Sequence, residues 1–413
     1  MATNLPQSSK KRILIAGIDG YLGWPTAQFL AAQGHVVGGI DNYFRRRWVR
    51  EMGSISAIPV APIEERLEGF RERVGQTLHF WEGDLRESTF AETVIREFQP
   101  DAVIHLAQCP SAAFSMLDAE HAILVQTNNL STTFNLSFAV HQHAANCHLV
   151  KVGSMSEYGT PDVSIPEGFF DVAYRDRQAR LPFPRQADSW YGWSEVHSSD
   201  NLMFACRNWD LRVTNLMPGV IFGTRAGEAE TDRRLKTRLD FDQAFGTILN
   251  RFCCQAVAGH PLTLFGGGRQ KRTFLSLRDA LQGLRLVIDT PPKPGEYRVL
   301  NHFSDTYSTA ELALKVSDVA RELKLDPEIC YLENPRREAA EHFYDVQLQG
   351  LFELGYWPER DFESEIRVML QDLIPCRDRI RSRQEVLIPD VRWDGSRQKA
   401  APLPQKAMAA SAV

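Results

Sequence analysis

Three glycines and an aspartate near the start of the chain have types and spacing that suit dinucleotide binding. Gly17, Gly20 and Gly23 follow a strand-like run and precede a helical pattern. Because glycine has no Cβ, the backbone there can turn tightly and a pyrophosphate can approach the N-terminus of the helix, where free N–H groups favour anions. Asp41 comes 24 residues after Gly17, close to the spacing at which a carboxylate accepts hydrogen bonds from the adenosine ribose. The pattern predicts NAD, in preference to NADP, as the cofactor.

Two alternatives to this interpretation remain open. The glycines can serve only to pack a helix against a strand, with Asp41 capping a turn. The run from Arg45 to Arg47 also bears on the cofactor, because an arginine near this position can pair with the 2′-phosphate of NADP. A solvated charged run or a pyrophosphate clamp explains these arginines equally, and beside Asp41 we favour that interpretation.

Tyr191 and Glu195 have the types and spacing for proton transfer. Glu195 follows Tyr191 by four positions, which places both on one face of a helix, and the motif Gly153-Ser154-Met155 precedes them in the chain. A tyrosine hydroxyl can take a proton from a substrate hydroxyl when its pKa is lowered, and a neighbouring carboxylate raises that pKa. We therefore expect Tyr191 and Glu195 to share proton transfer while Ser154 orients the reacting hydroxyl. The alternative is a purely structural pair.

Alternating strand and helix patterns must position these residues. Strand-like runs occur at 13–16, 36–41, 78–81, 102–106, 148–152 and 211–216, with helical segments between them. This alternation predicts an α/β fold, a Rossmann-type doubly wound parallel sheet with a smaller C-terminal α/β substrate lobe. We expect a disordered tail at 1–10 and an NAD-binding domain at 11–221. A mainly substrate-binding lobe at 222–376 and a partly disordered C-terminal extension at 377–413 should follow.

The composition excludes several classes of function. Lys and Arg total 47 against 52 Asp and Glu, a formal charge of −5, which argues against nucleic acid as a partner. The seven cysteines are scattered without a C-x-x-C pair, so we expect neither disulfides nor a metal site. No run of eighteen apolar residues and no apolar N-terminal stretch occurs, so we expect a cytoplasmic protein without a membrane partner.

Longer motifs carry a family resemblance. Gly20-Tyr21-Leu22-Gly23-Trp24, Glu157-Tyr158-Gly159-Thr160-Pro161 and Gly259-His260-Pro261-Leu262-Thr263 resemble segments of the UDP-sulfoquinovose synthases. These are extended short-chain dehydrogenase/reductases, of the NAD-dependent epimerase/dehydratase family. The resemblance runs from about Arg12 to Cys376. It implies that C4 of UDP-glucose is oxidised with NAD, water leaves across C5–C6, sulfite adds to the enone and the hydride returns. It also implies a nucleotide-sugar partner and a homodimer.

The resemblance and the motifs together predict a set of binding residues. Asp84 follows the third strand and can reach adenine, although a helix cap explains it equally. The expected cofactor-binding residues are Gly17, Asp19, Gly20, Tyr21, Leu22, Gly23, Asp41, Asn42, Arg45, Asp84, Leu85, Leu106 and Asn128. The expected substrate-binding residues are Met155, Asn250, Arg251, Arg272, Arg336 and His342, of which the resemblance implies that Arg272 and Arg336 pair with the diphosphate.

The chain departs from the family pattern at its reaction centre. The family's Tyr-x-x-x-Lys becomes Tyr191-x-x-x-Glu195, its histidine after the tyrosine becomes Gly192, and its arginine is absent from 107–116. A site for a small dianion needs donors or positive charge. We therefore expect a dehydratase-like lyase that modifies a nucleotide sugar or nucleoside by transient oxidation, elimination of water and hydride return. The alternatives are UDP-sulfoquinovose synthase itself and a non-catalytic dinucleotide-binding protein.

Overall fold

A parallel sheet forms the body of the protein. The computed structural model describes residues 9–226, 232–336, 341–359, 361–388 and 391–393, so most of the expected disordered tails lie outside the described residues. Seven strands pair in the order β3-β2-β1-β4-β5-β8-β12, and every neighbouring pair is parallel. The strands are β1 (Arg12–Ala16), β2 (Val36–Asp41), β3 (His79–Glu82), β4 (Ala102–His105), β5 (His148–Val152), β8 (Arg212–Pro218) and β12 (Tyr297–His302).

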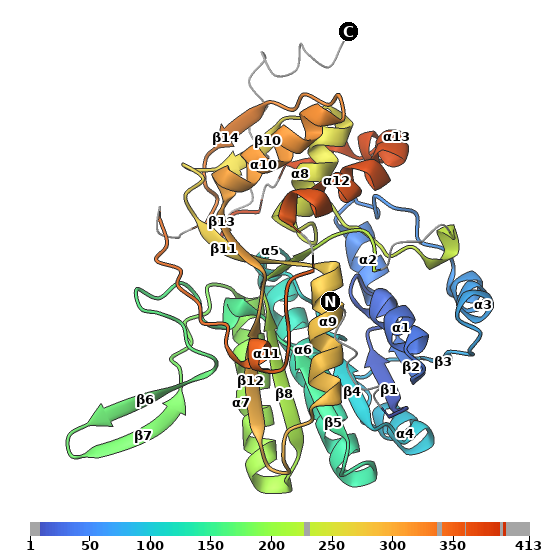
Figure 1. Cartoon of the computed structure of the whole chain (residues 1–413), viewed down its shortest axis with the longest axis vertical. Coiled ribbons are helices and arrows are strands. Elements are labelled where there is room, and N and C mark those ends of the chain that lie inside the picture. The colour runs from blue at the N-terminus through green and yellow to red at the C-terminus, as the bar shows by residue number, and fades with distance from the viewer. Residues whose placement is uncertain (1–8, 227–231, 337–340, 360, 389–390, 394–413) are drawn as a thin grey trace.

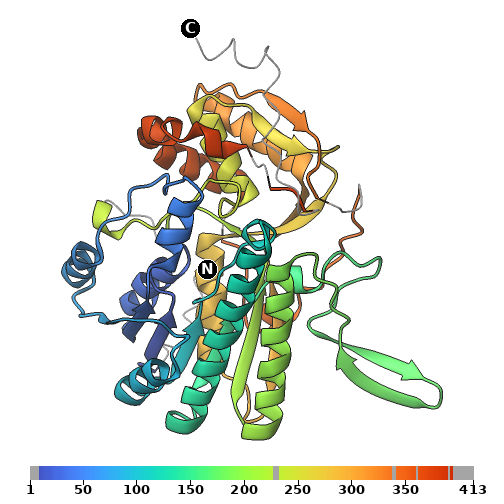
Figure 2. The same cartoon turned by 180° about the vertical axis from the view of Figure 1, so that it is seen from behind.

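Helices cover both faces of this sheet (Figures 1 and 2). On one face Trp24, Phe70 and Leu281 belong to a continuous apolar core. On the other, Ile95, Leu136 and Leu202 form a second core. The helices of the first face are α1 (Gly23–Ala32), α3 (Ile63–Val74) and α9 (Leu277–Asp289), and those of the second are α4 (Ser88–Phe98), α6 (Ala119–His143) and α7 (Trp190–Trp209). The expected α/β class and doubly wound parallel sheet are confirmed.

A second lobe packs above the carboxyl ends of the strands (Figure 1). Phe252, Val316 and Ile366 belong to its own apolar core. Its helices are α8 (Ile248–Ala258), α10 (Thr309–Glu322), α12 (Phe362–Leu373) and α13 (Arg377–Arg381). Its strands are β9 (Val220–Phe222), β10 (Leu262–Phe265), β11 (Lys271–Ser276), β13 (Asp305–Ser308) and β14 (Ile329–Leu332).

Residues on both sides of the boundary expected between 221 and 222 belong to the large sheet. Strand β12 pairs with β8 as the edge of the large sheet, and α9 contributes Leu281 and Leu284 to the core of its first face. The chain therefore leaves the sheet after β8, builds part of the second lobe, and returns. The short helices α2 (Phe44–Glu51), α5 (Ala112–Ser115) and α11 (Gly350–Glu353) lie in connections.

A two-stranded hairpin projects from the body between β5 and α7 (Figure 1). Its strands, β6 (Phe169–Tyr174) and β7 (Arg177–Pro182), pair in antiparallel register. Among the described residues no helix combines the length and the apolar composition needed to cross a bilayer.

Candidate active site

A cavity of about 320 Å³ lies at the carboxyl ends of the strands, beneath the second lobe. The strand order reverses between β1 and β4, where open α/β sheets bind their ligands. Turns after β1, β2, β4 and β5 line the cavity, together with helix α6, Tyr191 at the start of α7, and the segment leading into α8. The sheet and the second lobe thus share one cavity.

The glycine-rich turn after β1 fits a pyrophosphate. Gly17 has a φ of +89°, and a Cβ there would stand 2.6 Å from the carbonyl oxygen of Leu106. A Cβ on Gly23 would stand 2.2 Å from the carbonyl oxygen of Gly17, so this turn closes only around glycine. Gly20 lines the cavity, and α1 begins behind it without a side-chain cap. An uncapped helix N-terminus facing a cavity suits the diphosphate of NAD.

Asp41 stands at the end of β2 and lines the same cavity. Its Oδ2 accepts the backbone N–H of Asp19 at 2.8 Å, and its Oδ1 accepts the N–H of Tyr43 at 2.7 Å. Burial, followed by the charge of Asp19, raises the pKa of Asp41 to about 6, and the two N–H donors oppose that rise. The carboxylate is therefore fixed where the adenosine ribose of NAD would contact it.

Most of the other expected cofactor residues meet at this cavity, but two do not. Asp19 directs its carboxylate to Arg46 and Arg66 and is not among the described residues that line the cavity. Asp84 pairs with Arg86 at 2.6 Å and also accepts the backbone N–H of Arg86, which forms a turn ahead of α4, while Glu87 is the N-cap residue of that helix. The expected residues that line the cavity are Gly17, Gly20, Tyr21, Leu22, Gly23, Asp41, Asn42, Arg45, Leu85, Leu106 and Asn128.

Tyr191 and Ser154 come together at the far end of the site. Ser189 caps α7 by accepting the N–H of Gly192 at 3.1 Å, and the N–H of Tyr191 donates to Ser115 Oγ at 3.0 Å. The side chains of Tyr191 and Ser154 both line the cavity, and they lie close enough for Ser154 to affect the Tyr191 hydroxyl. Burial, followed by the charge of Glu195, holds the pKa of Tyr191 well above its ordinary value, and the Ser154 side chain opposes this rise. The charge of Glu195 therefore raises the pKa of Tyr191, which is the direction that the sequence predicted.

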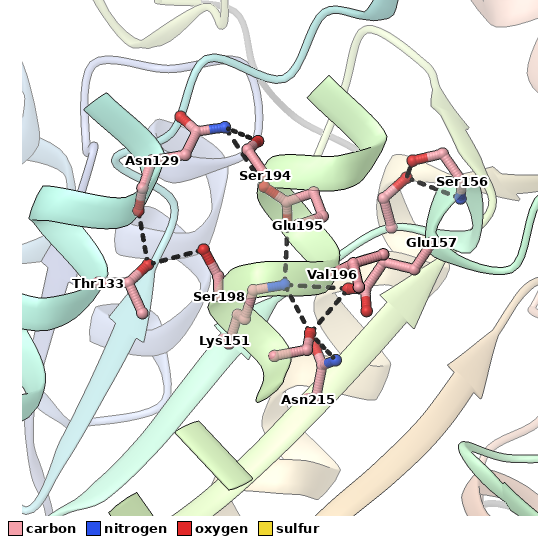
Figure 3. Close-up of polar contacts among 12 residues, drawn as sticks. Asn129, Thr133, Lys151, Ser156, Glu157, Ser194, Glu195, Val196, Ser198 and Asn215 are labelled. Atoms are coloured by element: carbon pink, nitrogen blue, oxygen red, sulfur yellow. Dashed lines mark hydrogen bonds and ion pairs between the residues drawn. The ribbon is translucent and has the colours of Figure 1, made fainter. Parts of the chain in front are cut away.

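Glu195 occupies a different environment from the one expected. Its side chain is fully buried, is not among the described residues that line the cavity, and places Oε2 2.8 Å from Lys151 Nζ (Figure 3). Lys151 Nζ also lies 3.0 Å from Glu157 Oε1. The carboxylate is held against an ammonium group because a buried charge needs a partner. Glu195 therefore does not face the cavity in which a nicotinamide ribose would bind.

Lys151 is the residue that the sequence interpretation missed. It lies on β5 and is fully buried, and burial alone would lower its pKa, but Glu157 and Glu195 outweigh burial and raise it. Asn129 Nδ2 on α6 donates to Ser194 Oγ at 2.9 Å and reaches Glu195 Oε1 at 3.4 Å. The available signal was a lysine inside the apolar run 148–152, since such a charge must find a partner.

The expected substrate residues divide between the cavity and the second lobe. Asn250 lines the cavity, and Met155 is buried directly after Ser154. Arg251 follows on α8, and its pKa is lowered to about 10 by burial and by the nearby charge of Arg336. On β11, Arg272 Nη1 lies 2.6 Å from His342 Nδ1. Arg251, Arg336, Arg272 and His342 are not among the described residues that line the cavity.

Within the described part of the chain, no group of three or more His, Cys, Asp and Glu side chains could hold a metal ion.

Comparison with known proteins places this site in a family context. The model of the NAD dependent epimerase/dehydratase family matches residues 13–301. The UDP-sulfoquinovose synthase of Sulfolobus acidocaldarius is 39% identical over 383 residues, 92% of this chain and 97% of that protein. The chloroplastic UDP-sulfoquinovose synthase of Spinacia oleracea is 39% identical over 386 residues, 94% and 80% of the two chains.

Solved structures show the same fold at lower identity. The UDP-glucose 4-epimerase of Bifidobacterium longum, in complex with NAD⁺ and UDP, superposes with a TM-score of 0.67 at 18% identity. That similarity covers 89% of this chain and 99% of the epimerase. The UDP-glucose 4-epimerase of Thermotoga maritima, solved with UDP-glucose, gives 0.65 at 16% identity, covering 87% and 98%.

Proposed function

The chain belongs to the NAD dependent epimerase/dehydratase family, and from this premise we propose that it converts UDP-glucose and sulfite to UDP-sulfoquinovose. NAD as the expected cofactor and enzymatic activity of this family type are confirmed. The similarity to two UDP-sulfoquinovose synthases favours the function that the sequence interpretation kept as its alternative over dehydration alone.

One observation of the site carries the proposal. The hydroxyls of Tyr191 and Ser154 share a single cavity with the glycine-rich turn and Asp41. A nucleotide bound on that turn would bring its redox-active ring toward the two hydroxyls, since turn and hydroxyls lie at the same edge of the sheet. The alternative of an inert tyrosine and serine does not explain why both line this cavity.

The side chains support a balanced sequence of steps. NAD supplies the hydride acceptor at C4 of the sugar and later the hydride donor. Ser154 orients the C4 hydroxyl, and Tyr191 accepts its proton as the C–H bond at C4 breaks and a ketone forms. Loss of the C5 proton and the C6 hydroxyl as water leaves an enone, and sulfite then forms a C–S bond at C6 while a proton returns to C5. Return of the hydride to C4, with the proton from Tyr191, would restore the alcohol.

The charge balance around Tyr191 differs from that of a tyrosine–lysine pair. The Lys151 ammonium lies behind Glu195 and is bound by two carboxylates, so it offsets the negative charge of Glu195 without contacting the tyrosine. We propose that Glu195 acts on Tyr191 through charge and that proton transfer to substrate passes through the Tyr191 hydroxyl. Glu195 is then a positioning residue.

Dehydration without sulfonation is the second candidate, favoured by one specific observation. Arg45 is the one arginine or lysine among the described residues that line the cavity, and its Nε lies 2.8 Å from Asp240 Oδ2. A sulfite dianion would compete with that carboxylate for the guanidinium. In this case the hydride would be added at C6 and a proton at C5, so that a 4-keto-6-deoxy sugar forms without a C–S bond.

Mass spectrometry of one reaction separates the two candidates. We expect purified protein, incubated with NAD, UDP-glucose and sulfite, to form a sulfonated UDP-sugar, and Tyr191→Phe to form none. A dehydrated UDP-sugar that is the same with and without sulfite would replace the proposal by the dehydratase. Binding of NAD and UDP-glucose with no new product under either condition would contradict both.

A further inference from the structure

We propose that Asp19 helps the site to select NAD over NADP by holding Arg46 away from the 2′-phosphate position. The inference rests on the NAD chemistry of the proposed function, and concerns residues beside the adenosine end of the cavity. It assigns a role to a carboxylate of the glycine-rich turn that does not itself line the cavity.

Two guanidinium groups converge on the Asp19 carboxylate. Arg46 binds it with two parallel hydrogen bonds, Nε to Oδ2 and Nη2 to Oδ1, both 2.7 Å. Arg66 Nη1 lies 2.5 Å from Oδ1, and its guanidinium carbon lies 4.0 Å from the centre of the Trp24 ring. The exposed fractions of the Asp19 and Arg66 side chains are 1% and 0%, so solvent does not compete for these bonds.

The same turn connects these ion pairs to the ribose position. The backbone N–H of Asp19 donates to Asp41 Oδ2, while Asp41 itself lines the cavity. Arg46 follows Asp41 by five residues, in the region where an arginine accommodates the 2′-phosphate of NADP. Its side chain is 23% exposed while its fork is occupied, and its chain neighbour Arg45 lines the cavity.

The chemistry of the guanidinium explains the selection. An arginine fork binds carboxylate and phosphate with the same bidentate geometry, so the bond to Asp19 uses the donors that a 2′-phosphate would need. Asp41 repels the phosphate and accepts from the ribose hydroxyls, while Asp19 removes the arginine that would offset this repulsion. The carboxylates of Asp41 and Asp19 therefore both favour NAD over NADP.

Calorimetric titration with NAD and with NADP tests the role of Asp19. We expect Asp19→Asn to shift the ratio of the two dissociation constants toward NADP by at least about tenfold, the scale of one charge-assisted phosphate contact. The combined change Asp19→Asn and Arg46→Gln should restore the original ratio, and Arg46→Gln alone should leave it unchanged. The matched control is Asp232→Asn, which breaks the exposed pair with Arg234 instead.

The outcomes that overturn the inference are distinct. An unchanged ratio in folded Asp19→Asn would show that Asp19 plays no part in selection, and a shift that survives Arg46→Gln would show that Arg46 is not the group released. Asp19→Asn leaves Arg66 buried with its charge uncompensated, so if it fails to fold the titrations use Asp19→Asn with Arg66→Met. Loss of turnover alone would bear on the proposed function, not on this ratio.

Discussion

Glu195 acts on Tyr191 through its charge, which makes the pH dependence of catalysis the readout. Glu195→Gln removes a charge that raises the pKa of Tyr191, so that pKa falls. We expect the rising limb of kcat/KM against pH to move to lower pH. Asp200→Asn, at a 51%-exposed side chain of the same helix, is the control. A loss of about 10²–10⁴-fold at every pH, without a shift, would instead make Glu195 the base, as the sequence interpretation expected.

Lys151 holds two buried carboxylates, so removing its charge should cost stability. Lys151→Met leaves Glu157 and Glu195 without their ammonium partner, and we expect the free energy of unfolding to fall by about 3–5 kcal/mol. Urea denaturation measures this. Lys315→Met is the comparison, because Lys315 and Glu363 are 28% and 41% exposed and such pairs contribute about 0–1 kcal/mol. Equal losses in the two variants would contradict the account.

At the scale of residues, the sequence predicted local motifs better than side-chain partners. The glycine turn, Asp41, Ser154 and Tyr191 line one cavity because each stands directly after a strand or at a helix start. The partner of Glu195 was not predictable in this way. Lys151 lies 44 residues earlier on β5, and only the packing of α7 against the sheet brings the two charges together.

The side chain of His121 on α6 contacts Glu51 on α2, and the strength of this contact depends on pH. His121 Nε2 lies 2.7 Å from Glu51 Oε1, and Nδ1 lies 2.6 Å from Asp118 Oδ1. Burial alone would lower the pKa of His121, but the bonds to Asp118 and Glu51 outweigh it and raise the pKa above 6.5. The protonated form is thus favoured in the folded state.

A raised folded pKa fixes the sign of this effect. The stabilisation of the folded protein by protonated His121 is fully present below the unfolded pKa of about 6.5, and it is lost as pH rises through the higher folded pKa. We expect His121→Gln to lower the free energy of unfolding more at about pH 5.5 than at about pH 8.5. The difference should stay below about 1 kcal/mol because Glu51 is exposed. Glu51→Gln should reduce the dependence, and equal losses at both pH values would refute it.

At the scale of elements, periodicity predicted β1 to β5 and β8 of the large sheet but not the return of the chain to that sheet. Strand β12 reads as one more short apolar run, and nothing local distinguishes an edge strand of the large sheet from a strand of the second lobe. Its place follows from pairing with β8, which is a long-range contact. The hairpin of β6 and β7 was missed for a related reason, since its residues bury too little to produce a clear alternation.

For the whole molecule, the second lobe should supply binding energy for the nucleotide sugar. Arg272→Ala removes a guanidinium that the family resemblance assigns to the diphosphate, and a charge-assisted phosphate contact contributes about 1.5–3 kcal/mol. We expect UDP-glucose to bind about 10–100-fold more weakly while NAD affinity is unchanged, as calorimetry can measure. Arg269→Ala, at an exposed arginine in the preceding loop, is the control. Unchanged UDP-glucose affinity would remove Arg272 from the site.

The arrangement of two lobes around one cavity fits a reaction in which the redox step and the sugar chemistry share one site. The sequence predicted both lobes with a boundary after residue 221, and the chain returns to the large sheet beyond that point, since α9 and β12 belong to that sheet's layers. The homodimer and the cytoplasmic location expected from the sequence stay predictions.

Hydride return is the central claim, and isotope labelling tests it most directly. UDP-glucose carrying deuterium at C4 is incubated with the protein, sulfite and NAD in less than the amount of substrate, and the product is measured by mass spectrometry and NMR. We expect the sulfonated product to retain the deuterium at C4, because the hydride that leaves that carbon returns to it. A product without deuterium, formed only in the amount of NAD supplied and accompanied by reduced NAD, would contradict the account.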